Sequence, residues 1–318
     1  AYYLLKGKWT NVARRSMMVA SAFGLASSLS VVVLGDESGY ALTDNQRMKL
    51  AAIEAMWHTE EAPAGLSIFG IPDMEAQETR FEVKVPYVLG LISTRSLTGE
   101  VMGINELVLK ADERIRSGIV AYDAVEKLKV HRTDMAAREQ FERHKADLGY
   151  AMLLKRHVAD PRSATDQQIL LAAKDTIPNV PVMFWLFRIM AGLGFFFIGF
   201  FALAFYCASA CKFSKPWFLK IAVAIIPLPW IAIEFGWMLA EIGRQPWAVE
   251  GVLPTFLAAS SLTVGQIWTT IIGFTLLYGT LAVIEVRLMI ATIRKGPVEH
   301  HEPEMLRGSA GYAPLPAE

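Results

Sequence analysis

The stretch PVMFWLFRIMAGLGFFFIGFFALAFYCASAC, residues 181–211, decides the fold class, because Arg188 is its only charged side chain. It is longer than the roughly 20 apolar residues that a helix needs to cross the hydrocarbon core of a bilayer. Three further runs have the same character: residues 16–35, 217–240 and 265–292. Buried helices of a soluble protein rarely produce four such runs. The sequence therefore predicts an all-α integral membrane protein, a bundle of transmembrane helices.

The composition favours the same class. Of the 318 residues, 53% are hydrophobic and 19% are charged, compared with roughly 25% charged residues in soluble domains. The 31 basic and 31 acidic side chains give a formal net charge of +0, so the chain has no overall field that would attract nucleic acid. We expect a lipid bilayer as its surroundings and no nucleic acid partner.

Lysine and arginine near the ends of the apolar runs predict the orientation in the membrane, because positive flanks stay in the cytoplasm. They cluster before the first run, between the second and third, and after the fourth. Residues 1–15 are then the end of a preceding span and a cytoplasmic loop, and residues 293–318 are a cytoplasmic tail. The loops 36–180 and 241–264 are expected on the other side, which is the periplasm of a bacterium. The chain begins with Ala1, and we expect it to be a fragment.

The loop at residues 36–180 is too long to lack structure, so we expect it to fold as a large, mostly helical extracytoplasmic loop. Helix-forming composition or helical spacing of apolar residues predicts helices at 42–57, 104–128 and 134–157. Thr165 followed by Gln168 is typical of a capping box at a helix start. Residues 62–86 contain three prolines and two glycines, which would break a helix.

Arg188 is a candidate functional residue, because an ionisable side chain within a membrane span is costly. At 1.5 Å per residue it would lie about 10 Å inside the outer end of its helix. In one interpretation, Arg188 binds a haem propionate while the thioether of Met190 binds the haem iron. In the other, Arg188 pairs with a carboxylate and Met190 only packs. The residues alone leave both interpretations open.

A second group of charges lies at the end of the third run. Trp230, Glu234, Trp237 and Glu241 recur at helical spacing, so they share one face of a helix. Two acids on a buried face are costly unless they bind a cation or carry protons. Arg244 follows Glu241 by about one helical turn, so a simple ion pair is the alternative.

Lys49 and Glu54 lie five residues apart in the long loop. This spacing separates them by about 140° around a helix, so a direct surface pair is not expected. They could flank a pocket, in which a carboxylate accepts a proton and a lysine donates to an oxygen. Alternatively, they are two solvated charges.

Together these residues resemble a known family. The motifs VVVLGDESGYAL, KLAAIEAMW, FRIM and GRQPW followed by VLPT stand in the order and spacing of subunit I of the cytochrome bd quinol oxidases. The resemblance runs from about residue 1 to residue 295 and includes the long quinol loop of one branch of the family. The chain is similar to the latter portion of that subunit. The portion that would hold histidine ligands of the haems is expected to be missing, so this fragment is expected to be inactive alone.

The resemblance implies an enzyme, an O2-reducing quinol oxidase of the bacterial inner membrane with haem b558, haem b595 and haem d. Quinol, in this branch ubiquinol, would be oxidised at the periplasmic face. Electrons would pass through haem b558 to the haem b595 and haem d centre, which reduces O2 to water. The expected partners are subunit II and a small single-span subunit.

The resemblance also implies roles for individual residues. Lys49 and Glu54 match catalytic residues that bind quinol together with Arg95. The expected haem-binding residues are Arg188, Met190, Trp237, Glu241 and Arg244. Met190 matches the ligand of the haem b558 iron, and Glu241 matches the residue that serves the haem b595 iron.

Two other classes of protein remain as alternatives. A secondary transporter could use Arg188, Glu234 and Glu241 along a polar path. A non-catalytic assembly subunit could keep the spans and the loop without binding iron. Bound haem would distinguish an oxidase from both.

Overall fold

The computed structural model describes residues 1–62, 64–96, 98–210 and 216–297. The basic link predicted between the second and third runs lies outside these residues, as does the tail from residue 298 onward. The chain forms two compact units, Ala1–Ala259 and Ser260–Glu318. The fold is mostly helical, which confirms the predicted fold class.

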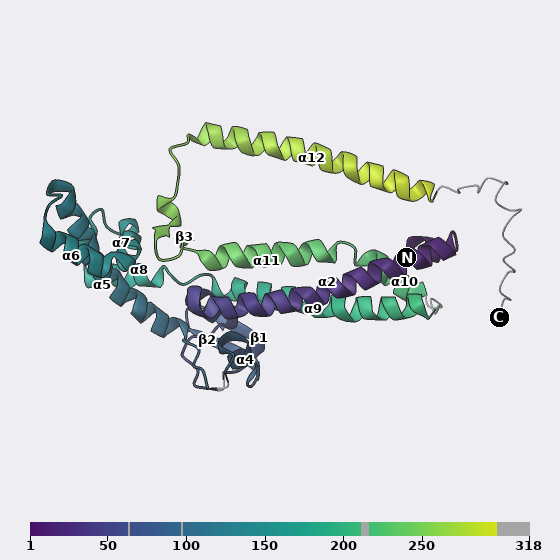
Figure 1. The fold of residues 1–318 in the computed structure, drawn as a ribbon, viewed down its shortest axis with the longest axis horizontal. Coiled ribbons are helices and arrows are strands. Elements are labelled where there is room, and N and C mark those ends of the chain that lie inside the picture. The colour runs from purple at the N-terminus through teal and green to yellow at the C-terminus, as the bar shows by residue number, and fades with distance from the viewer. Residues whose placement is uncertain (63, 97, 211–215, 298–318) are drawn as a thin grey trace, which may run out of the picture. The chain divides into compact units, whose positions relative to one another are not determined.

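The helices in chain order are α1 (Tyr2–Leu5), α2 (Thr10–Asn45), α3 (Arg47–Glu54), α4 (Val88–Thr94), α5 (Ile104–Val130), α6 (Met135–His144), α7 (Leu148–Leu153), α8 (Asp166–Lys174), α9 (Val180–Ser209), α10 (Pro216–Ala224), α11 (Leu228–Arg244) and α12 (Val264–Lys295) (Figure 1). The strands are β1 (Leu66–Asp73), β2 (Glu78–Val85), β3 (Trp247–Val249) and β4 (Leu253–Pro254). Short 3-10 helices occupy Lys145–Asp147, Leu154–Arg156, Pro161–Ser163 and Thr255–Leu257.

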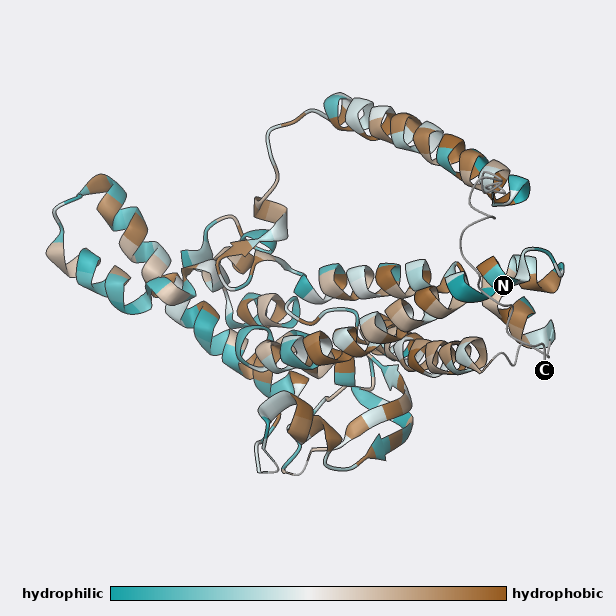
Figure 2. Ribbon diagram, turned by 45° about the vertical axis from the view of Figure 1, so that its right-hand side comes forward, coloured by the Kyte–Doolittle hydropathy of each residue, from teal (hydrophilic) through white to brown (hydrophobic). Residues whose placement is uncertain are grey.

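Four helical stretches are long and apolar enough to cross a membrane: Thr10–Asn45, Val180–Ser209, Pro216–Arg244 and Val264–Lys295. Brown, apolar residues predominate along them in Figure 2. The first extends well beyond the apolar run at 16–35, and the third consists of two helices, α10 and α11. The break between them falls at Pro227, which caps α11, and Pro229 follows in the first turn, where its missing N–H is tolerated.

Helix α9 is central to the first unit, because it packs against both α2 and α11. At Gly24 of α2, an added Cβ would lie 2.8 Å from ring atoms of Phe201 on α9. The glycine therefore permits the close approach of these two helices, as small residues do in membrane bundles. Many of the outward-facing side chains are large and apolar, and Phe23 and Phe195 are 75% and 71% exposed.

The long loop between α2 and α9 is largely helical, as predicted. The helix predicted at 104–128 is confirmed as α5, against which α6, α7 and α8 pack. The side chain of Asp134 caps α6, and Thr165 and Gln168 form the predicted capping box of α8. The prediction of one helix over 134–157 was wrong, because the 3-10 turn at Lys145–Asp147 separates α6 from α7.

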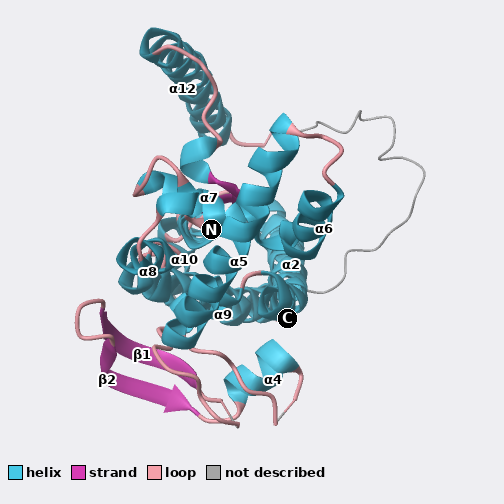
Figure 3. Cartoon of the chain, turned by 90° about the vertical axis from the view of Figure 1, so that its left-hand side faces the viewer, coloured by secondary structure: helices cyan, strands magenta, loops and turns pink. Residues whose placement is uncertain are grey.

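The segment at 62–86, which was predicted only to be non-helical, contains an antiparallel hairpin of β1 and β2 (Figure 3). Leu66 pairs with Val85 at one end of the hairpin and Asp73 with Glu78 at the other. In the turn, Oδ1 of Asp73 accepts hydrogen bonds from the following backbone N–H groups. The predicted helix at 42–57 is likewise divided, because Gln46 separates α2 from α3.

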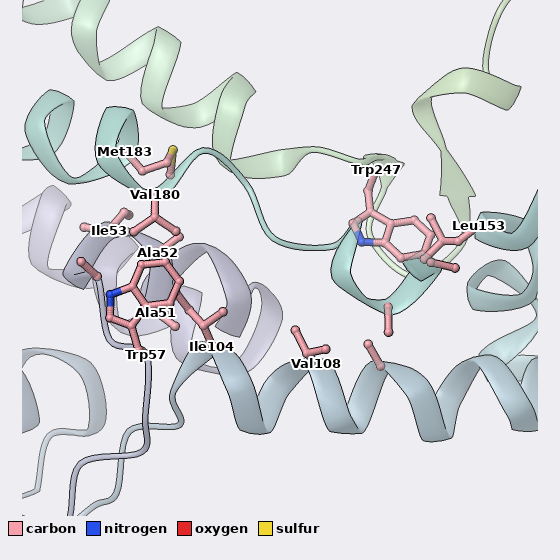
Figure 4. Close-up of a cluster of buried hydrophobic side chains, with 14 of the residues drawn as sticks. Ala51, Ala52, Ile53, Trp57, Ile104, Val108, Leu153, Val180, Met183 and Trp247 are labelled. Carbon is pink, nitrogen blue, oxygen red and sulfur yellow. The ribbon is translucent and has the colours of Figure 1, made fainter. Parts of the chain in front are cut away.

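The largest buried cluster joins the loop to the membrane helices (Figure 4). Ile53 and Trp57 come from α3 and the residues after it, Ile104 from α5, Met183 from α9, and Trp247 from β3. Each of these side chains is at most 5% exposed. This packing fixes α3 against the first turns of α9, where the candidate site lies.

Candidate functional site

Glu54, the last residue of α3, is 2% exposed and forms an ion pair with Arg188 of α9. Nη2 of Arg188 donates to Oε2 of Glu54 at 3.0 Å and to the carbonyl of Ser67 at 2.5 Å. Nη1 donates to the carbonyls of Ile53 at 2.5 Å and Phe184 at 3.1 Å. Of the two interpretations of Arg188, the structure shows the pair with a carboxylate.

This pair is well enclosed and joins three segments of the chain. The guanidinium carbon of Arg188 lies 3.4 Å from the ring centroid of Phe184, a cation–π arrangement. Burial raises the pKa of the Glu54 carboxyl, while the charge of Arg188 acts in the opposite direction. Nε of Arg188 is buried without a hydrogen-bond partner among the described atoms. Glu54 is therefore not the solvated charge that one interpretation expected.

Met190 lies two residues beyond Arg188, at the contact between α9 and α11. A Cβ added to Gly236 of α11 would lie 3.0 Å from Sδ of Met190, so the thioether faces this helix. A thioether is a soft ligand that binds haem iron in cytochromes. The glycine leaves room beside the sulfur that a larger residue would fill.

Glu241 and Arg244 form an ion pair within the last turns of α11. Both side chains are partly exposed, and Nε of Arg244 is buried without a partner among the described atoms. The predicted alternative of a simple ion pair therefore describes their contact. Trp237, which was predicted on the same helix face, is 61% exposed.

Lys49 of α3 is half-buried and faces α11, on a different side of α3 from Glu54. A Cβ added to Gly243 would lie 2.8 Å from Cγ of Lys49, so the glycine makes room for the lysine side chain. Burial lowers the pKa of the Lys49 ammonium, and the charge of Arg244 lowers it further. Lys49 and Glu54 form no pair, as the spacing predicted.

Lys49 borders a cavity of about 540 Å³, and Glu54 does not. Its walls also include Arg114 of α5, Tyr150 of α7, and Trp247 and Glu250 from the segment after α11. Sequence reasoning missed these residues. The signal for Glu250 was available, because it is an acid shortly after GRQPW in an otherwise apolar segment.

Arg95 is not brought together with these groups. It follows α4, and its Nη2 pairs with Asp36 at 3.1 Å and Glu37 at 2.7 Å, both on α2. Its guanidinium also lies 4.8 Å from the ring centroid of Tyr40. Arg95 is thus held against α2, with its side chain 47% exposed.

The order of these residues along the chain matches a known family. Residues 1–297 match the family described as cytochrome bd terminal oxidase subunit I. The chain belongs to this family. Since cytochromes are haem proteins, membership implies haem cofactors in general.

Two curated relatives show how much of the subunit I sequence this chain represents. The chain is 36% identical over 311 residues to cytochrome bd-II ubiquinol oxidase subunit 1 of Escherichia coli K12, covering 97% of this chain and 60% of that protein. It is 28% identical over 306 residues to cytochrome bd ubiquinol oxidase subunit 1 of Bacillus subtilis 168, covering 95% and 53%. The chain therefore spans little more than half the length of these relatives.

A solved structure is similar in fold. The bd oxidase from Geobacillus thermodenitrificans superposes with a TM-score of 0.60 at 24% sequence identity, covering 93% of this chain and 53% of that one. At this identity the similarity shows the fold alone, a helical membrane protein.

The residues of this subunit I chain fit a haem at Met190. The thioether lies beside a glycine, and two buried arginine Nε atoms, of Arg188 and Arg244, have hydrogen-bonding capacity left. Within the described residues, histidines lie outside the four apolar helices, and no group of three or more His, Cys, Asp or Glu side chains could hold a metal ion. Met190 is one of several methionines in these helices, and its sulfur lies beside Gly236 of α11.

Proposed function

We propose that this chain forms the quinol-oxidising part of a terminal respiratory oxidase of the inner membrane, which passes electrons from quinol to O2 and forms water. One observation carries the proposal: α3, α9 and α11 meet where Lys49, Glu54, Arg188 and Met190 lie. A loop that can bind a polar substrate is thereby joined directly to a helix that can bind haem. The substrate that we propose is ubiquinol, which is named for the relatives in Escherichia coli and Bacillus subtilis.

The proposed orientation places the loop 36–180 and the connection 241–264 in the periplasm. The distribution of lysine and arginine around the apolar segments supports it. The proposed membrane segments are 16–35, 181–211, 217–240 and 265–292, and residues 1–15 and 293–318 are proposed to be cytoplasmic. Quinol oxidation would then release its protons into the periplasm.

For the haems, we propose that Met190 ligates the iron of haem b558 and that Glu241 serves the iron of haem b595, near haem d. Trp237 and Arg244 would border that second centre. Haem supplies one-electron oxidation and reduction, and in the oxidase it also binds and reduces O2. Any further ligand of that iron would come from elsewhere in the assembled oxidase, because the described histidines lie outside the apolar helices.

Arg188 has a positioning role in this proposal. Its Nη atoms are bound to Glu54 and to backbone carbonyls, so it holds α3 and β1 against α9 two residues from Met190. A fixed positive charge near a haem stabilises the reduced state, so Arg188 would raise the potential at which electrons arrive.

At the substrate, we propose that Lys49 donates a hydrogen bond to a quinol oxygen. Glu54 would take part in proton acceptance, through a linked water because it is enclosed by Arg188 and Ser67. Arg95 would stabilise the loop at a separate place, by its contacts with α2. Subunit II and a small single-span subunit are the proposed partners, and the exposed apolar faces of the helices suit such packing.

The test is a reduced-minus-oxidised spectrum of membranes that contain the assembled oxidase. Met190→Leu is expected to remove or shift the band of the low-spin b haem. Met238→Leu, on the neighbouring helix with its side chain 38% exposed, is the matched control and is expected to leave the band unchanged. An unaltered spectrum in Met190→Leu would reject the ligand assignment. Absence of haem bands in the wild type would favour the transporter or assembly role.

A further inference from the structure

The cavity of about 540 Å³ contains an acid that the proposed function does not use, Glu250. The cavity lies among α3, α5, α7 and the segment after α11, and Lys49 also lines it. Neither the Lys49 ammonium nor the Glu250 carboxylate has a hydrogen-bond or ion-pair partner in the described part of the chain. Each still influences the ionisation of the other. Two opposite charges thus border one cavity without forming a pair.

The cavity walls also carry the charged residues Asp44, Arg47 and Lys110, but the charges that act on the ionisation of Glu250 are those of Lys49 and Arg114. Arg114 of α5 donates from Nε to Asp147 at 2.6 Å and from Nη1 to the hydroxyl of Tyr150 at 3.1 Å. Its guanidinium carbon also lies 4.1 Å from the ring centroid of Tyr150. Arg114 lowers the energy of a charged Glu250 from a distance but does not neutralise it by contact. Glu250 therefore keeps its carboxylate free for a ligand.

The backbone around Glu250 is held firmly in place. The Trp247 ring is 3% exposed and lies 5.0 Å, between centroids, from that of Tyr150. Gly149 of α7 touches the backbone of Gly251 and Val252 so closely that an added Cβ would collide with it. Gly251 adopts φ +68°, which glycine tolerates. The segment that carries Glu250 is thereby fixed against α7.

We propose that Glu250 is the carboxylate that accepts a proton from a quinol hydroxyl in this cavity, opposite Lys49. This inference rests on the proposed quinol oxidation and adds a catalytic residue to it. Glu54 is enclosed by Arg188 and lies outside the cavity walls, whereas Glu250 lines the cavity and is unpaired. A quinol has two ring oxygens, so one can face the lysine while the other faces the acid.

One hydroxyl O–H bond breaks, and its proton forms a new O–H bond on a carboxylate oxygen of Glu250. The proton of the second hydroxyl leaves to water in the cavity. Bound haem would supply the oxidant by accepting the two electrons one at a time, and the quinol is left as the quinone.

Burial supports this role, because it raises the pKa of Glu250 to about 7, against the opposing charges of Arg114 and Lys49. The pKa of Tyr150 is also raised, so its phenol stays protonated near this acid at neutral pH. A general base is most effective when its pKa lies near the working pH. Glu250 can then accept a proton and release it again to the periplasm.

The experiment compares wild-type oxidase with Glu250→Gln over pH 5.5 to 9, using ubiquinol-1 as substrate. In the wild type, kcat/KM is expected to rise with pH through about 7, as Glu250 ionises. Glu250→Gln is expected to lower kcat/KM about 10²-fold, the usual contribution of a general base, and to abolish the rise. Glu250→Asp, which keeps a carboxylate, is expected to retain the rise at a lower rate. The matched control is Glu113→Gln on α5, an exposed acid outside the cavity walls, which is expected to behave like the wild type.

Two further readouts separate the possible failures. The haem spectrum of Glu250→Gln is expected to equal that of the wild type, and ubiquinone-1 is expected to bind the oxidised variant with a Kd within a few fold of the wild-type value. A Glu250→Gln oxidase with the wild-type rate and pH profile would overturn the inference while the proposed function stands. A haem-loaded wild type without quinol-dependent O2 uptake would overturn the proposed function, and the inference with it.

Discussion

Nη2 of Arg188 on α9 lies 3.0 Å from Oε2 of Glu54 at the end of α3, and the two side chains are 9% and 3% exposed. These residues are 134 positions apart in the sequence. Their ion pair joins the extramembrane loop to the apolar helix that carries Met190. Movement or loss of either charge would therefore disturb both the loop and the proposed haem ligand.

Removing one partner of this pair is expected to be strongly destabilising. Glu54→Ala leaves the Arg188 charge buried without its carboxylate, which typically costs about 3–5 kcal/mol. Glu54→Gln is expected to cost less, because the amide oxygen can still accept hydrogen bonds. The measurement is thermal unfolding of the purified protein in detergent. Glu37→Ala removes an exposed partner of Arg95 and serves as the control, with an expected loss of about 0–1 kcal/mol. Equal losses in Glu54→Ala and Glu37→Ala would contradict the importance of burial.

Gly236→Ala is expected to displace the thioether of Met190. The new Cβ would lie 3.0 Å from Sδ, closer than ordinary van der Waals contact, so the sulfur must move. In the assembled oxidase we expect a shifted band or a changed midpoint potential of the low-spin b haem, measured by spectroelectrochemistry. Gly192→Ala, on α9 near Met190 with no atom within 4 Å of an added Cβ, is expected to leave both unchanged. The same spectrum in both variants would argue against Met190 as ligand.

Gly243→Ala is expected to move Lys49 away from its position at the cavity. The added Cβ would lie 2.8 Å from Cγ and 3.0 Å from Cε of Lys49, and it would also collide with Met183. Overpacking of this kind costs about 1–3 kcal/mol. We expect lower thermal stability and a several-fold higher KM for ubiquinol-1. Gly199→Ala is the control, because an added Cβ there has open space around it. An unchanged KM in Gly243→Ala would show that Lys49 does not contact the substrate.

The stability of the protein is expected to depend on pH through Glu250. Its pKa is about 7 in the folded protein, above the ordinary value of 4.5, so the folded state binds this proton more tightly than the unfolded state. The resulting stabilisation is fully present below about pH 4.5 and is lost as the pH rises through 7. Because the side chain is only partly buried, we expect wild type to lose on the order of 1 kcal/mol relative to Glu250→Gln between pH 5 and 8. The measurement is the free energy of unfolding of both proteins as a function of pH. The same pH dependence in wild type and Glu250→Gln would contradict the raised pKa.

The helical nature of the long loop could be predicted from local sequence, but its internal divisions could not. Asp134 and the Thr165–Gln168 box act within one helical turn, so the sequence sufficed to place these helix starts. The break at Lys145–Asp147 has no glycine or proline to mark it. There α7 turns to pack on α5, where Gly118 lies against the backbone of Asp147 and Ala151. Local helix propensity predicted one continuous helix here, and the packing of α7 on α5 divided it into two.

The sequence by itself determined the apolar helices and the family, because hydropathy over a helix length and the order of short motifs are properties of adjacent residues. Only the tertiary structure decided that Glu54 is bound to Arg188, that Lys49 faces α11, and that Glu250 and Lys49 share a cavity. Such contacts join residues far apart in the chain. They depend on which helix faces pack together and on which polar groups become buried away from water as a result. A single segment of sequence predicts neither of these.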